Sequence, residues 1–200
     1  MKVRMIYGIV LLCVVLLLSC GTALKEIALK SQSARTDVFK EVQEGEPIPR
    51  EFVELTITSS IKTHLEGDYL LESKKLLHGT PGYPFVINID GQAVTWKVDG
   101  REEDTPPYDE GGQTSPEGGE GIRYNLQKKI LLRAGSHKIF FGVPREKLAL
   151  HFELALKAGD INVLDFRPVY KRRGKQPRHF FHGVSGFEVV LNGNVIKLRK

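Results

Sequence analysis

The feature that most constrains the fold is a series of short runs rich in Val, Ile, Phe and Tyr, separated by glycine-containing turns, from Phe52 to the C-terminus. Such runs are typical of β-strands. The clearest case is the pair of runs 188–191 and 194–198 on either side of Asn192-Gly193. Asn-Gly readily adopts the two positive φ angles of a type I′ turn, so this segment predicts a two-residue β-hairpin.

One all-β domain is the simplest interpretation of this pattern. No long segment with the 3.6-residue helical repeat follows Arg50, although residues 144–150 could form a short helix. Residues 149–156 and 161–170, joined by a turn, are predicted to form an antiparallel pair. We therefore expect residues 51–200 to fold as a single antiparallel β-sandwich of the meander or hairpin type. About 150 residues are enough to bury a substantial core.

Residues 99–121 interrupt the strands with a low-complexity segment rich in carboxylates and glycines, which we call the acidic insertion. Calcium takes six to eight oxygen ligands, so carboxylates on a flexible backbone could bind it. The ordered spacing of a calcium-binding loop is absent, however. We expect a mobile, solvated hairpin loop, and the sequence leaves calcium binding open.

The first twenty residues have a different character. Two basic residues, Lys2 and Arg4, precede an apolar stretch at 6–18, which runs into Leu17-Leu18-Ser19-Cys20 and is followed by Gly21. This arrangement resembles a bacterial lipoprotein signal peptide that ends in a lipobox. The alternative, a membrane-spanning helix, would need about 20 apolar residues, more than this stretch provides.

The resemblance implies that residues 1–19 are a signal peptide, which is cleaved before Cys20, and that Cys20 is then acylated. Lipid chains on Cys20 would anchor an exported protein to a membrane of the cell envelope. Gly21, in place of Asp after the cysteine, resembles a signal for the outer membrane, with the domain on the periplasmic or the surface face. Residues 20–50 would be a polar tether, with a short helix around Leu24 and Ile27 as an alternative for part of it.

Processing of this kind limits the chemistry of the mature chain. Cys13 would be lost with the signal and Cys20 would become a thioether, which excludes redox chemistry and cysteine catalysis. Of the 29 basic residues, loss of Lys2 and Arg4 leaves 27 against 24 acidic ones. This near-neutral balance does not favour nucleic-acid binding.

Two short motifs occur in a suggestive order. Ile87-Asn88-Ile89-Asp90-Gly91 precedes the run from Leu132 to Ile139, which contains Gly135 and His137. Residues 85–170 are thereby similar to PEGA-type surface modules, small β-sandwiches in which an I-D-G hairpin precedes an L-x-x-G-x-H-x-I/V turn. The chain departs from that pattern in the acidic insertion and in lacking proline-threonine elements. The resemblance implies an architecture and no activity.

The segment after residue 170 carries the highest density of positive charge in the sequence. We call residues 171–178 the basic loop. Basic side chains near an anionic surface each contribute about 1 kcal/mol to binding, so phospholipid head groups or envelope glycans are candidate partners. A solvated connection is the alternative. The candidate contact residues are Lys171, Arg172, Arg173, Lys175 and Arg178.

The histidines and serines give no specific signal for a metal site or a catalytic site. His179 and His182 have the spacing of two zinc ligands, but a site needs a third or fourth ligand. We expect Phe180 or Phe181 to pack inward there. Ser136 and His137 are neighbours on a strand and point to opposite faces, so they cannot act as nucleophile and base.

A triad of Ser59 or Ser60, His64 and a distant carboxylate is left open, without the G-x-S-x-G signature. The sequence therefore predicts no catalytic residues, no metal and no cofactor. We expect a lipid-anchored envelope protein that acts as a binding or structural module. Its partners would be the membrane, through Cys20, and an anionic envelope polymer or an envelope protein. The alternatives are a hydrolase of envelope glycan or lipid and an accessory subunit of an envelope assembly.

Overall fold

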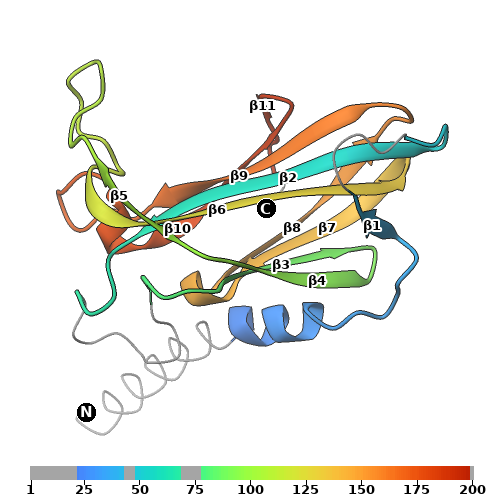
Figure 1. Cartoon of the computed structure of the whole chain (residues 1–200), viewed down its shortest axis with the longest axis horizontal. Helices are drawn as coiled ribbons and strands as arrows, with labels where there is room; N and C mark the ends of the chain where they lie inside the picture. Colours follow the sequence, from blue (N-terminus) through green and yellow to red (C-terminus); the bar gives the residue numbers. More distant parts are fainter. Residues whose placement is uncertain (1–21, 43–47, 69–77, 199–200) are drawn as a thin grey trace, which may run out of the picture.

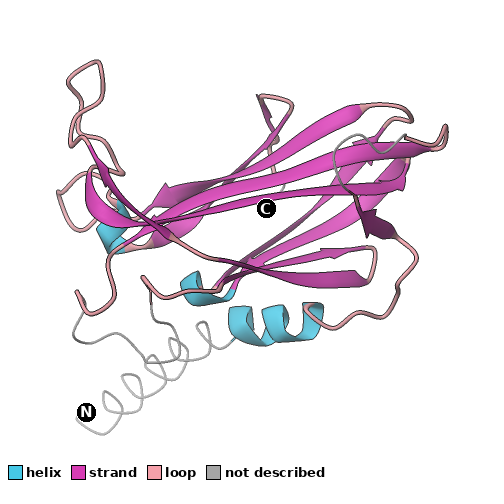
Figure 2. Cartoon of the chain, in the orientation of Figure 1, coloured by secondary structure: helices cyan, strands magenta, loops and turns pink. Residues whose placement is uncertain are grey.

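The computed structural model describes residues 22–42, 48–68 and 78–198, and these residues form two β-sheets (Figures 1 and 2). The all-β class is therefore confirmed. The larger sheet has seven strands, in the order β1 (Phe39–Glu41), β6 (Gly119–Arg133), β2 (Phe52–Thr63), β9 (Ile161–Tyr170), β10 (Val184–Leu191) and β11 (Asn194–Val195), with β5 (Arg101–Thr105) also beside β6. The smaller sheet has four, in the order β4 (Gln92–Val98), β3 (Tyr83–Ile89), β7 (Gly135–Val143) and β8 (Leu148–Leu156).

The hydrophobic core lies between the two sheets. In β2, Val53, Leu55 and Ile57 are fully buried and alternate with partly exposed residues, as expected for a strand with one face on a core. The rings of Phe141 on β7 and Phe166 on β9 stack across the core, with centroids 3.9 Å apart. Aromatic side chains therefore join the smaller sheet to the larger one.

The predicted hairpin at Asn192-Gly193 is confirmed. Leu191 pairs with Asn194, and the two turn residues have φ angles of 50° and 81°. The returning strand ends at Val195 and is shorter than predicted. Residues 144–150 contain only a short 3₁₀ turn, η1 (Pro144–Glu146), before β8 begins.

The predicted antiparallel pair of residues 149–156 and 161–170 is wrong. β8 belongs to the smaller sheet and β9 to the larger one, so the turn between them carries the chain across the core. β9 instead pairs in parallel with β2, from Glu54 opposite Ile161 onward, and antiparallel with β10. The backbone N–H of Gly159 donates to the Phe52 carbonyl, which directs the chain to β2 as soon as the turn ends.

For residues 22–42 the structure shows the alternative, a short helix around Leu24 and Ile27, and not a polar tether throughout. Residues 22–30 form a helix on the outer face of the smaller sheet (Figure 1). Ile27 is 4% exposed and packs against Val86 and Phe140. Further along, β1 pairs with β6. A few apolar side chains in an otherwise polar segment are enough to fix it, because the outer face of the sheet offers an apolar surface.

The acidic insertion is more ordered than a mobile loop. Its β5 pairs with the first residues of β6, and a bridge between Tyr108 and Thr114 closes the tip. Cys20 and residues 43–47 and 69–77 lie outside the described residues. Within the described part of the chain, no helix has the length and apolar character needed to cross a membrane.

Gly100 permits the chain to pass from β4 in the smaller sheet to β5 in the larger one. A Cβ atom at this position would overlap Ile122 Cγ2 and lie 2.7 Å from Tyr124 Cε1. Both neighbours are side chains of β6 that face the core, so they have little room to move.

We expect Gly100→Ala to lower the free energy of unfolding by about 1–3 kcal/mol, the usual cost of overpacking a core. Urea denaturation, followed by circular dichroism, measures this change. Gly186→Ala is the matched control, because a Cβ at Gly186 meets no atom within 4 Å. Equal stability of the two variants would contradict the packing argument.

Candidate functional site

The basic loop leaves the end of β9 and returns to β10 through the 3₁₀ turn η2 (Phe180–His182). All eight of its residues are exposed. The backbone of Lys171 closes the base of the loop: its N–H donates to the Gly183 carbonyl, and its carbonyl accepts from the N–H of His179. The backbone of the loop is therefore held in place, while its side chains are left to the solvent.

The five predicted contact residues of the basic loop lie within this exposed segment. None of them forms an ion pair with another residue in the described ranges. Cations that are not held in a close ion pair stay available to an external anion. The five residues that share this exposed loop are Lys171, Arg172, Arg173, Lys175 and Arg178.

The acidic insertion supports the base of the basic loop. His179 Nε2 donates to the Gly118 carbonyl at 2.9 Å, and the N–H of Phe180 donates to the Pro116 carbonyl at 2.8 Å. His179 Nδ1 accepts from the N–H of Phe181 at 3.3 Å, so the ring is the neutral Nε2–H tautomer in this arrangement. Partial burial lowers the pKa of His179, which favours this neutral form.

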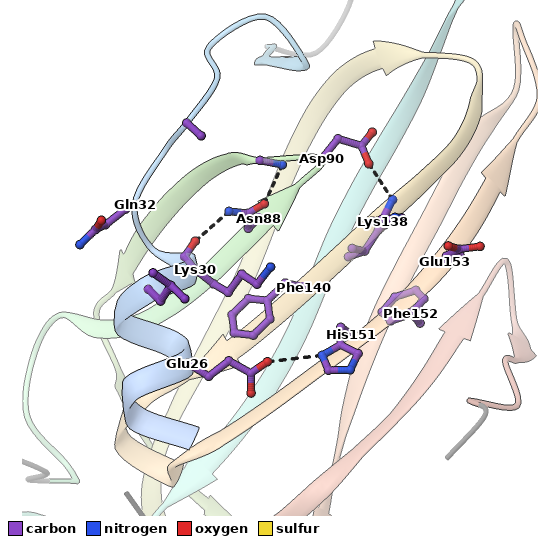
Figure 3. A pocket seen from close by; sticks show the side chains of 14 residues that line it. Glu26, Lys30, Gln32, Asn88, Asp90, Lys138, Phe140, His151, Phe152 and Glu153 are labelled. Carbon is purple, nitrogen blue, oxygen red and sulfur yellow. Dashed lines mark hydrogen bonds and ion pairs between the residues drawn. The ribbon is translucent and has the colours of Figure 1, made fainter. Parts of the chain in front are cut away.

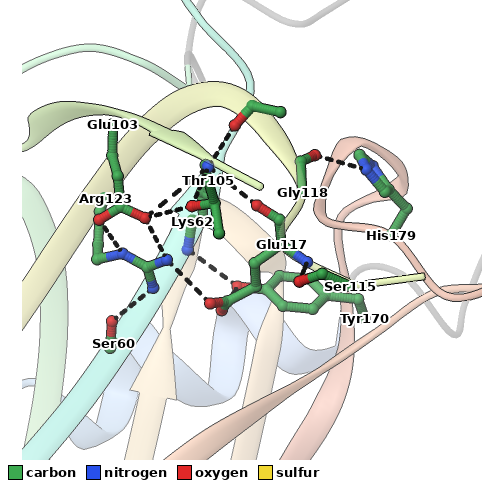
Figure 4. A network of polar contacts seen from close by, with 11 residues as sticks. Ser60, Lys62, Glu103, Thr105, Ser115, Glu117, Gly118, Arg123, Tyr170 and His179 are labelled. Carbon is green, nitrogen blue, oxygen red and sulfur yellow. Dashed lines mark hydrogen bonds and ion pairs between the residues drawn. The ribbon is translucent and has the colours of Figure 1, made fainter. Parts of the chain in front are cut away.

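A buried lysine fixes the acidic insertion to the larger sheet (Figure 4). The side chain of Lys62 on β2 is fully buried, and its ammonium group donates to Thr105 Oγ1 and to the carbonyls of Glu117 and Gly119. The three donors of the ammonium group are thus all used. The ring of Phe180 covers the same group, with its centroid 5.0 Å from Nζ. Burial lowers the pKa of Lys62.

Arg123 on β6 holds the two sides of the acidic insertion together. Its guanidinium donates to both carboxylate oxygens of Glu103 at 2.6 Å and to Glu117 at 2.9 Å. The hydroxyl of Tyr170, the last residue of β9, donates to the other oxygen of Glu117 at 2.8 Å. The hydrogen bonds from Arg123 lower the pKa of Glu103 to about 2. We call Lys62, Glu103, Glu117, Arg123 and Tyr170 the anchoring network.

A groove of about 640 Å³ lies elsewhere, between the helix of residues 22–30 and the outer face of β3, β7 and β8 (Figure 3). The ring of Phe140 lies on its sheet side, and Glu26 approaches His151 at 3.5 Å across it. Asn88 donates to the Lys30 carbonyl and accepts from the N–H of Gly91, which ties the end of the helix to the β3–β4 turn. The volume suits a small ligand.

The motif residues Asp90 and His137 meet at one end of this groove but act as structural groups. His137 Nδ1 contacts Asp90 Oδ2 at 2.7 Å, and His137 Nε2 contacts the Arg133 carbonyl at 2.8 Å. The other oxygen of Asp90 accepts from the N–H of Lys138. The two motifs that contain Asp90 and His137 therefore supply the contacts that hold the β3–β4 turn against the start of β7.

The serine and histidine residues do not assemble into the triad left open by the sequence. Ser59 Oγ donates to the Phe166 carbonyl, Ser60 Oγ accepts from Arg123, and His64 Nδ1 contacts the Leu65 carbonyl. The rings of His179 and His182 are 6.2 Å apart. The described residues contain no group of three or more metal-binding side chains. Phe180 is buried, as predicted, and Phe181 is 37% exposed.

One buried polar cluster was not predicted from the sequence. Glu146 Oε1 accepts from the Tyr83 hydroxyl and contacts His78 Nε2, both at 2.8 Å, and Oε2 accepts from the N–H of Val184. Burial alone would raise the pKa of Glu146, but these hydrogen bonds lower it on balance. No motif surrounds Glu146 in the sequence, and its partners come from distant elements, so no local signal could reveal the cluster.

No protein-family model, no curated protein and no solved structure matches the chain. The resemblances to lipoprotein signals and to PEGA-type modules therefore stay predictions.

The low pKa of Glu103 gives a pH dependence of known sign. Its folded-state pKa is about 2, below the ordinary value of 4.5, so its contribution to stability is present above pH 4.5 and is lost between about pH 4.5 and pH 2. We expect Glu103→Gln to be less stable than the wild type at pH 6, with the difference shrinking as the pH falls toward 2.

Urea unfolding at a series of pH values measures this difference. Glu110→Gln at the exposed tip of the acidic insertion is the matched control and should change stability little at any pH. A Glu103→Gln penalty that stayed constant from pH 6 to pH 2.5 would show that the Arg123 pair does not produce the dependence.

Proposed function

We propose that the protein is a lipid-anchored, non-catalytic module of the bacterial cell envelope and that the basic loop contacts an anionic surface. The observation that carries the proposal is the basic loop itself, with five exposed cations that have no ion-pair partner within the described residues. Its backbone is fixed by the anchoring network through the acidic insertion, which lowers the entropy lost when it binds.

The position of the helix supports contact with a membrane. The helix of residues 22–30 runs along the long axis of the molecule toward β1 (Figure 1). Its first residue is at the end that lies nearer the basic loop along this axis. Cys20 lies two residues before the helix, a chain length of at most about 7 Å. A lipid on Cys20 would therefore hold this side of the domain close to the bilayer, where the cations of the basic loop meet phospholipid head groups.

The architecture fits a binding module. We infer that the two sheets and their shared core constitute a β-sandwich, comparable to the PEGA-type modules that residues 85–170 resemble. The contact between Asp90 and His137 supports this inference, because it joins the two halves of the motif in the fold. No observation favours the hydrolase alternative: the hydroxyls of Ser59 and Ser60 are engaged in structural hydrogen bonds.

We expect the domain from residue 22 onward to bind vesicles that contain phosphatidylglycerol, and to bind them more weakly as salt is raised. Serine at Lys171, Arg172, Arg173, Lys175 and Arg178 should reduce the affinity by about two orders of magnitude or more, since each basic residue near an anionic surface contributes about 1 kcal/mol. Vesicle co-sedimentation at several salt concentrations measures this binding.

The matched control removes the same number of charges from exposed positions outside the basic loop. It carries serine at Arg50, Lys97, Lys138, Lys157 and Lys197. This control should retain most of the binding if the loop is the contact surface. Equal binding by the loop variant and the wild type, or an equal loss in both variants, would reject the loop as a specific contact.

The lipid anchor has its own test. We expect metabolic labelling of producing cells with a fatty acid to mark the wild-type protein and not Cys20→Ala, because acylation needs the thiol of Cys20. The variant should stay folded, since the two hydrophobic clusters of the described residues are built from Ile27 and from Phe39 onward. Cys13→Ser is the control and should still be labelled. Label on Cys20→Ala would exclude Cys20 as the anchor.

A further inference from the structure

Strand β8 is an edge strand whose outer side has no partner strand in the described part of the chain. It is the last strand of the smaller sheet and pairs with β7 alone, in continuous register from Leu148 to Leu156. The register shows no bulge, and the strand contains no proline and no lysine. Native proteins usually protect a long edge strand with such devices, because its free N–H and C=O groups can pair with another chain.

Several other edges of the described sheets carry such protection. At the opposite edge of the smaller sheet, the side chain of Gln92 on β4 bonds to the backbone of Phe39, and Trp96 Nε1 donates to Glu41, both on β1. In the larger sheet, β5 consists mostly of charged residues, and β1 and β11 have three and two residues. β8, with nine residues, is longer than these strands and lacks these devices.

The sequence of β8 is symmetric in its chemistry. Around Phe152 as the centre, an antiparallel pairing of the strand with its own copy places Leu opposite Leu, Ala opposite Ala, and His151 opposite Glu153. The last pair occurs twice, once on each side of the centre. The strand reads Leu148-Ala149-Leu150-His151-Phe152-Glu153-Leu154-Ala155-Leu156.

The outward residues make this symmetry informative. The leucines of β8 and Phe152 pack toward the core, so their repetition follows from the strand pattern alone. His151, Glu153 and Ala155 are exposed, and packing does not determine their identity. Residues directly opposite each other in an antiparallel pair lie on the same face, so His151 of one copy would meet the carboxylate of Glu153 of the other.

We propose that the protein forms a homodimer in which the β8 strands of two copies pair antiparallel around Phe152. The two four-stranded sheets then join into one continuous sheet, related by a two-fold axis through the Phe152 pair. The pairing places an imidazole beside a carboxylate twice, and this match of an N–H donor with an acceptor selects the register. A shift by one residue would place core-facing residues on the outer face and is excluded.

The groups that already face His151 are compatible with this dimer. Glu26 of the neighbouring helix lies 3.5 Å from His151 Nδ1, and both side chains are at least 39% exposed. Glu153 of the second copy would approach the imidazole from the open side of β8. His151, Phe152 and Glu153 also line the groove, so the dimer would place the two grooves side by side along the shared strand pair.

Disulfide formation tests the register of the dimer. The full chain, with Cys13 and Cys20 replaced by serine and purified in detergent, removes the native thiols and any dependence on a lipid anchor. Ala149→Cys and Ala155→Cys are made separately, in copies of different mass. Residues 149 and 155 are directly opposite in the proposed pairing, with Cβ atoms about 5 Å apart, whereas two copies of either residue are about 20 Å apart.

We expect mild oxidation to cross-link the mixture of the two variants and to cross-link neither variant alone. Cross-linking of Ala149→Cys with itself would indicate a different register and would overturn the proposal. So would the absence of any cross-link at high protein concentration, which would leave β8 as an edge that a second copy does not occupy.

Charge exchange tests the chemistry of the interface by analytical ultracentrifugation of the same cysteine-free chain. Glu153→Lys places Lys opposite His151 in both pairs, and we expect it to raise the dimer dissociation constant by about tenfold. His151→Glu combined with Glu153→Lys places opposite charges in both pairs and should recover the dimer; all of the compared variants carry Glu26→Gln, which removes the carboxylate beside residue 151. Lys157→Glu, just beyond the strand, is the control and should have no comparable effect.

The rescue distinguishes an interface from a structural role, because a change that only damaged the fold would not be repaired by a second substitution. Circular dichroism of each variant verifies that the fold is retained. A dimer insensitive to Glu153→Lys would place the interface elsewhere and overturn the proposal. A loss in Glu153→Lys without recovery in the double variant would likewise overturn the pairing of His151 with Glu153.

Discussion

The stacking of Phe141 on Phe166 is the contact on which the arrangement of the two sheets depends. One ring comes from β7 in the smaller sheet and the other from β9 in the larger one, and Phe85 and Phe187 extend the cluster on both sides. Because these rings occupy the centre of the core, each sheet must turn its opposite face outward. The outer face of the smaller sheet becomes the support for the helix of residues 22–30, and one end of the larger sheet carries both charged segments (Figure 1).

In these charged segments, buried polar groups hold exposed loops in place. Lys62 lies on the central strand β2, yet its ammonium group reaches the acidic insertion, and Arg123 joins Glu103 to Glu117 nearby. The acidic insertion in turn bonds to the backbone of Phe180, at the foot of the basic loop. Two carboxylates of the acidic insertion, Glu103 and Glu117, are thus paired within the anchoring network, while the cations of the basic loop are left for solvent or for a partner.

Local chemistry made part of this structure predictable from the sequence. Alternating apolar residues and the Asn192-Gly193 turn determine strands and a hairpin through interactions between neighbours, and both predictions are confirmed. The sheet assignment of β8 and β9 could not be predicted, because a four-residue turn can either pair two strands or carry the chain across a core. Likewise, nothing in the sequence distinguishes Lys62 from other lysines, because its partners Thr105 and Glu117 come close to it only in the fold. The basic loop was visible in advance because charge density needs no tertiary context.

The parallel pairing of β2 with β9 also has a consequence for how the chain folds. Ser59 on β2 and Phe166 on β9, which share a hydrogen bond, are separated by 107 positions in the sequence. One edge of β2 pairs with β6, and the other edge pairs with β9. The second pairing requires the chain to cross from β8 in the smaller sheet to β9 in the larger one. Contacts between such distant segments are slow to form, because the entropy of closing the loop is lost before they provide any stabilisation. We therefore expect the centre of the larger sheet to be among the last parts of the molecule to close.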